Sequence, residues 1–170
     1  MKKKSKNFNR IVAVLLVCLL LMTLVIPALG AISSVQWWHM VDSGKHLDWA
    51  GSTKYQSDFN SSVSTWNAYK SGVIRKDSIL YVKDATISDE RWINGTAGET
   101  NGNDKTIKFN LNKMDTMNQN QRRNLYTHEL GHALGLDHNQ VGDVMYYISS
   151  SVYSLSANDK ASYDTSYNRY

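Results

Sequence analysis

Three of the chain's five histidines lie within residues 127–139, Thr-His-Glu-Leu-Gly-His-Ala-Leu-Gly-Leu-Asp-His-Asn. On a helix, His128 and His132 are four positions apart, so their imidazoles project from one face about one turn apart. Glu129 lies on the same side. Two imidazoles at this spacing suit a single metal ion, which predicts that this stretch is helical and that its other face packs on the fold.

A glycine after the second histidine predicts where this helix ends. Gly135 can adopt the left-handed conformation that ends a helix and lets the chain double back. His138 would then arrive as a third nitrogen ligand. Three protein ligands leave one position of a tetrahedral zinc ion for water, as in catalytic sites, and zinc lowers the pKa of that water to about 7. Glu129 is the right kind of group to take its proton, so no protein nucleophile is needed.

The complete pattern, His-Glu-x-x-His-x-x-Gly-x-x-His at residues 128–138 with Met145 further on, resembles the metzincin metalloproteases. The Ala-Leu-Gly-Leu run before Asp-His is most similar to the matrixin branch and its small secreted bacterial members. The close resemblance covers about residues 105–148. It implies that Met145 underlies the zinc as an apolar platform and is not a ligand.

The resemblance also implies a secreted zinc endopeptidase that hydrolyses protein or peptide substrates and carries one catalytic Zn²⁺. Substrate would lie extended along an edge strand within residues 92–100. Tyr147 has a spacing from Met145 similar to that of the tyrosine that astacins and serralysins place near their zinc. It is a candidate transition-state stabiliser; alternatively, Tyr146 and Tyr147 only form a wall of the pocket. A zinc-stabilised binding domain without activity is the competing function, but such a domain has no need of Glu129.

Residues 1–30 have the pattern of a signal peptide: five Lys and Arg, an apolar run over residues 11–26, and small residues at the end. Cleavage after Gly30, with cleavage after Ala31 as the alternative, would leave residues 31–170 as one catalytic domain. The alternative is an uncleaved segment that anchors the same domain to the outside of a membrane. We otherwise expect no membrane contact, and we expect a monomer.

The basic composition of the whole chain comes from this N-terminal segment. Residues 31–170 carry 14 Lys and Arg against 15 Asp and Glu, which gives no indication of a nucleic-acid partner. Cys18, the only cysteine, lies in the apolar run. The domain would therefore have no disulfide and would depend on its core and its metal.

The periodicity of apolar residues predicts the other elements. Residues 57–69 predict a helix with one buried face. Residues 78–83, with Ile-Leu-Tyr-Val at their centre, predict a strand buried on both faces. A further strand is expected over residues 49–55. Residues 106–112 predict an antiparallel strand joined to its predecessor through an Asn-Gly turn.

The helix with the histidines would begin after Thr116 or Asn118 and continue to Leu134. Ser156 predicts the start of a last helix with a stripe of tyrosines at positions 163, 167 and 170. Residues 31–41 could form either a strand or an N-terminal cover. The expected fold is therefore α+β, a metzincin-like zincin domain with a small, mixed, twisted sheet, a packing helix, the zinc helix and a C-terminal helix.

Two further sets of side chains have metal-binding chemistry. The oxygen-bearing residues of the predicted turn could bind Ca²⁺, although an ordinary polar loop is the favoured interpretation: Glu99, Asn101, Asn103 and Asp104. His39 and His46 have no second ligand at metal spacing. We interpret them as ordinary histidines.

Overall fold

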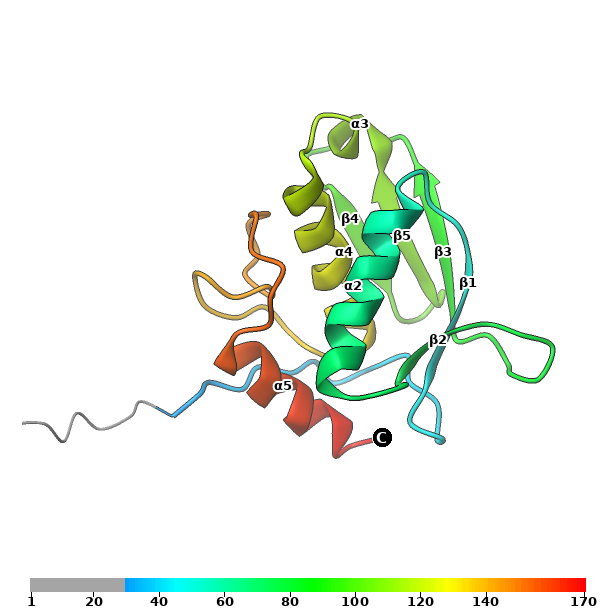
Figure 1. Cartoon of the computed structure of the whole chain (residues 1–170), viewed down its shortest axis with the longest axis vertical. Helices are drawn as coiled ribbons and strands as arrows, with labels where there is room; N and C mark the ends of the chain where they lie inside the picture. Colours follow the sequence, from blue (N-terminus) through cyan, green and yellow to red (C-terminus); the bar gives the residue numbers. More distant parts are fainter. Residues whose placement is uncertain (1–29) are drawn as a thin grey trace, which may run out of the picture. The chain divides into compact units, whose positions relative to one another are not determined.

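The computed structural model describes residues 30–170 (Figure 1), so the predicted signal peptide lies outside the described residues except for Gly30. Residues Ala31–Tyr170 form one compact unit. Within the described part, no helix combines the length and the apolar composition needed to cross a membrane.

A five-stranded mixed sheet forms one layer of this unit. Its strand order is β2-β1-β3-β5-β4. The first four strands in this order run parallel, and β4 pairs antiparallel with β5 at the edge. The bounds are Leu47–Gly51 for β1, Ile74–Lys76 for β2, Ala85–Glu90 for β3, Gly98–Asn101 for β4 and Thr106–Asn110 for β5.

Two helices, α2 (Gln56–Tyr69) and α4 (Gln119–Ala133), lie side by side over one face of the sheet (Figure 1). The core between them is aromatic. The Phe59 ring lies 4.9 Å from the Trp49 ring and 5.4 Å from the Tyr126 ring, and Tyr126 packs on Phe109 of β5 at 4.5 Å. The predicted α+β zincin fold, with a packing helix and a zinc helix, is confirmed.

The remaining helices are the short α3 (Leu111–Met114) and the C-terminal α5 (Ala157–Tyr167). Of the two caps proposed for the histidine helix, the structure has Asn118, whose side chain accepts from the Gln121 N–H in a capping box. Ser156 caps α5 as predicted, with Asp159 completing the box. Tyr170 lies beyond the end of α5, although its ring still contacts that of Tyr167.

The strand predicted over residues 78–83 is wrong. These residues form an exposed loop between β2 and β3, with a turn in which the Tyr81 N–H donates to Ser78 O. The sheet positions on either side of β1 are filled by β2 and β3 instead. The apolar run of residues 78–83 has a high β propensity, but no strand of the described sheet is left to pair with it. The lack of a neighbouring strand therefore outweighs the β propensity of the run.

Two other predicted strands are shorter than expected. β1 ends at Gly51, where φ is +105° and the backbone leaves the extended region. β5 ends at Asn110 because the Asn110 side chain caps the short helix α3. Residues 31–41 form a cover and not a strand of the sheet, since their only pairing is the bridge between Val35 and Leu136.

Candidate metal centre

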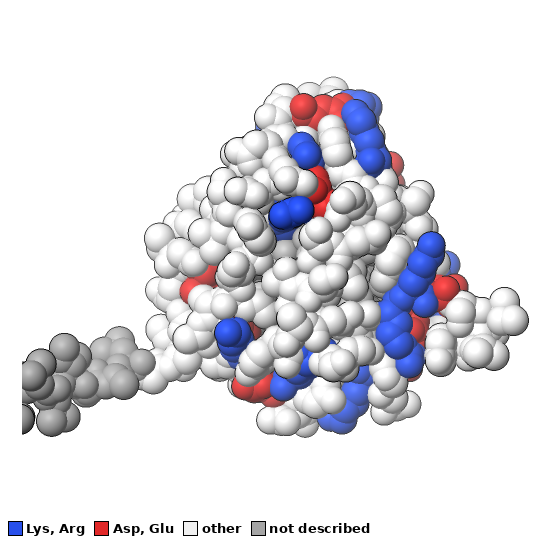
Figure 2. Space-filling model, viewed as in Figure 1, with Lys and Arg blue, Asp and Glu red and all other residues white. Residues whose placement is uncertain are grey.

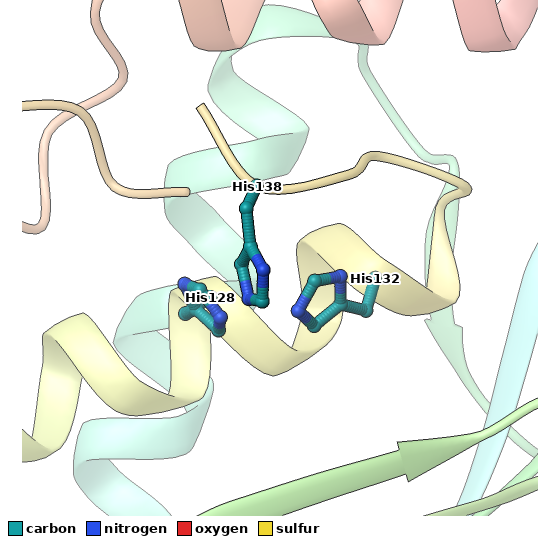
Figure 3. Close-up of side chains that lie close together, drawn as sticks. All are labelled: His128, His132 and His138. Carbon is teal, nitrogen blue, oxygen red and sulfur yellow. The ribbon is translucent and has the colours of Figure 1, made fainter. Parts of the chain in front are cut away.

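Figure 3 shows the imidazoles of His128 and His132 projecting from α4 toward that of His138, which comes from the segment beyond the helix. One ring nitrogen from each residue lies within 4.8 Å of the other two. The ring centroids are 4.6 to 5.3 Å apart. The spacing of the motif correctly predicted this convergence.

The reversal that brings His138 over the helix occurs at Gly135. Its φ is +86°, and its N–H donates to His132 O while the Leu136 N–H donates to Gly131 O. These two bonds form the predicted helix end with a glycine in the left-handed conformation.

The two helical histidines are oriented by backbone carbonyl groups. His128 Nδ1 lies 2.9 Å from Val144 O, and His132 Nδ1 lies 2.9 Å from Leu136 O. Because a carbonyl only accepts, the His128 Nδ1 carries the proton and its Nε2 keeps a free lone pair. The Leu136 carbonyl favours the same tautomer at His132, whose Nδ1 also lies 3.0 Å from the Gln36 side-chain amide. Burial lowers the pKa of all three histidines, and that of His132 falls to about 3. Neutral imidazoles of this kind suit zinc better than oxygen-seeking ions such as Mg²⁺.

A buried carboxylate lies beside the imidazoles. Glu129 Oε2 accepts a 2.6 Å hydrogen bond from the Thr100 hydroxyl of β4. Burial raises the pKa of Glu129 to about 7. Gly98, also in β4, leaves room for this side chain, because a Cβ there would lie 2.6 Å from Glu129 Oε1. Sequence reasoning missed Thr100 and Gly98, since no local pattern links them to the helix.

Met145 lies under the histidine helix in a fully buried position. A Cβ at Gly131 of α4 would overlap the Met145 sulfur, so the glycine lets the methionine pack directly against the helix. The Asp159 carboxylate of α5 accepts from the Val144 and Met145 N–H groups at 3.0 and 3.2 Å. Asp159, which also completes the capping box of α5, is thus a further supporting residue of the site.

The histidines and Glu129 open into a cleft of about 540 Å³ between α4 and β4. Tyr146 and Tyr147 line it, and the Tyr147 ring lies 6.3 Å from that of His138. Gln36 of the N-terminal segment also lines it, with Nε2 3.0 Å from His132 Nδ1. Nothing in the sequence around Gln36 indicated this position.

The other candidate ligands lie elsewhere. The His39 ring lies against the Tyr170 ring at an interplanar angle of 54°, and His46 Nδ1 lies 3.9 Å from Asp42 Oδ1. In the β4–β5 turn, Asn101 Oδ1 accepts from the N–H groups of Asn103 and Asp104. This is the bonding of an ordinary polar turn, and calcium there stays a prediction.

Gly98→Ala should displace the Glu129 carboxyl group without unfolding the chain, because the three atoms nearest to the new methyl group all belong to the flexible Glu129 side chain. We expect the peptide hydrolysis that the resemblance implies to fall about tenfold or more, since a small misplacement of the expected general base is costly. The matched control is Gly95→Ala in the same cleft, where a Cβ meets nothing within 4 Å. Equal hydrolysis by the two variants would contradict this role of Gly98.

Comparison with known proteins agrees with this geometry. A family model described as Matrixin matches residues 51–168, well over half of the chain. The matched region includes the histidine helix, the reversal and Met145. No curated protein matches the chain significantly. The chain belongs to the matrixin family and is a zinc metalloendopeptidase.

Proposed function

We propose that this metalloendopeptidase is secreted, that His128, His132 and His138 hold its catalytic zinc, and that Glu129 is the general base. The observation that carries the proposal is the convergence of three imidazoles beside a buried carboxylate in one open cleft. Bound zinc supplies a Lewis acid that polarises the peptide carbonyl group and acidifies water.

The protein's own groups prepare this site before substrate arrives. The carbonyl groups of Val144 and Leu136 hold the rings of His128 and His132 so that the Nε2 atoms remain available. The neutral state of these rings, favoured by burial, avoids the proton release that a protonated imidazole would require.

Glu129 is suited to move a proton in both directions. A group whose pKa lies near the working pH can accept a proton from the attacking water and return it to the leaving amine. Its pKa of about 7 meets this condition. The Thr100 hydroxyl fixes one carboxylate oxygen, which leaves the other available for water.

An extended peptide would bind along β4, whose outer edge has no strand beside it within residues 30–170. Backbone groups of such an edge can pair with an added strand. Glu99 and Thr100 of β4 line the cleft together with the histidines, so a peptide there would pass its scissile bond in front of Glu129.

A zinc-stabilised binding domain is the competing proposal. It leaves unexplained why a carboxylate is buried beside the imidazoles, where its charged form is disfavoured. Secretion rests on the pattern of residues 1–30. An extracellular protein that begins at Ala31 would support it, and a membrane-held protein with residues 1–30 intact would favour the anchored alternative.

Glu129→Gln should keep the bound zinc and lose activity, because the amide preserves shape but cannot take a proton. We expect kcat/KM for a peptide substrate to fall by about 10² to 10⁴. Metal content and hydrolysis are measured on the same preparations. Zinc retention with unchanged hydrolysis would remove Glu129 from the mechanism, and inactivity of the parent protein under the same conditions would favour the binding domain.

The Tyr147→Phe variant distinguishes between the two roles considered for this exposed tyrosine, which are transition-state stabilisation and lining of the cleft. If the phenol stabilises the transition state, kcat falls about tenfold or more while KM changes little. If the ring only lines the cleft, kcat is unchanged, because phenylalanine preserves the wall.

A further inference from the structure

The loop between β2 and β3 exposes the apolar run that the sequence suggested would be buried. Ile79, Leu80 and Val82 are 103, 79 and 86% exposed, and Tyr81 is 45% exposed. Contiguous exposed apolar side chains mark interaction sites in soluble folds. We propose that this loop is a lipid-contact site whose apolar tip inserts into the interface of an anionic membrane.

The loop is held in an outward position by its two ends. The Asp77 N–H donates to Trp49 O and the Asp84 N–H donates to Asp48 O, both at 2.7 Å, so the loop leaves and rejoins the fold on β1. At its base the Arg75 guanidinium lies 4.0 Å from the Tyr81 ring centroid and pairs with Asp48. The apolar tip is therefore presented by a fixed base.

The shape of the loop suits a bilayer. Figures 1 and 2 show it projecting from the body of the domain beyond β2. A convex tip can enter lipid without a matching pocket, whereas a protein partner would need a cavity shaped to receive it. Tyrosine at the base of an apolar tip also suits the headgroup region, where aromatic rings with one polar end are enriched.

The charge around the loop favours anionic headgroups. Lys76 and Lys83 flank the tip and are exposed, and exposed Lys105 lies on the neighbouring β3 side, where its carbonyl accepts from Thr86. Figure 2 shows basic side chains next to the white loop, with acidic atoms between them.

The carboxylates at this base are largely withdrawn from solvent. Asp48 and Asp84 are buried, Asp48 pairs with Arg75, and Asp84 accepts from the Asp48 N–H. Asp77 is half-buried.

The Asp42 side chain is 38% exposed, and one of its carboxylate oxygens lies within 4.8 Å of those of Asp48 and Asp84. The exposed charges that directly flank the tip are those of Lys76 and Lys83, which anionic lipid attracts.

Contact through this loop would leave the catalytic cleft free. The loop joins β2, at one edge of the sheet, to β3, whereas the cleft lies along β4 at the opposite edge. Loop variants should therefore hydrolyse a soluble peptide as the parent does, which also reports that they are folded.

The test measures binding to vesicles of phosphatidylcholine with phosphatidylglycerol and to vesicles of phosphatidylcholine alone. The loop variant is Ile79→Ser/Leu80→Ser/Val82→Ser, and the matched control is Ile93→Ser/Val141→Ser, which removes apolar side chains that are 100 and 78% exposed elsewhere. All proteins share one N-terminus, so residues 1–30 are identical in every comparison. We expect the loop variant to bind anionic vesicles at least about tenfold more weakly, with the control unchanged.

A site-specific probe adds a second readout. In a Cys18→Ser background, Leu80→Cys carries a fluorophore sensitive to polarity, and Ile93→Cys carries it in the control. We expect a blue shift with anionic vesicles at position 80 alone. Removing the charge of Lys76 or Lys83 should weaken binding about fivefold for each lysine.

Three results would overturn the proposal. The first is a probe at position 80 that stays in water while vesicles are present. The second is equal vesicle binding by the loop variant and the control variant. The third is a parent protein that light scattering shows to be an oligomer and a loop variant that is a monomer, since a second copy would then cover the loop.

Discussion

A straight continuation of α4 would carry a third histidine away from His128 and His132, so the metal centre depends on the reversal of the chain at Gly135. Residues outside the histidine motif pack against this reversal. A Cβ at Gly135 would lie 3.1 Å from Trp38 O of the N-terminal cover and would overlap the Ser166 hydroxyl of α5. Ser166 and Tyr170 both donate to Leu134 O at the helix end. The two ends of the domain therefore hold the site together, although neither contributes a ligand.

The centre of the site could be predicted because its causes are local. Helical spacing sets the direction of His128 and His132, and the stereochemistry of one glycine sets the return of His138. The helix boundaries were predictable for the same reason, because caps such as Asn118 and Ser156 act on the next few residues.

Contacts between distant segments could not be predicted in this way. Thr100 reaches Glu129 only because the β4–β5 hairpin lies against α4, and no spacing in the sequence records that pairing. The strand prediction for the segment that includes residues 79–82 is wrong for a related reason. The β propensity of a segment is the same whether or not a neighbouring strand exists, and the order of strands in the sheet decides which segments have a neighbour. The strand that was wrongly predicted is therefore the same segment that forms the exposed apolar loop, and packing within the fold does not explain that exposure.

X-ray absorption at the zinc edge of the purified protein tests the three-histidine assignment most directly. The account predicts one zinc per chain with light-atom ligands at about 2.0–2.1 Å and the outer-shell scattering of three imidazoles. A shell that contains sulfur, or an oxygen shell without the imidazole pattern, would contradict it.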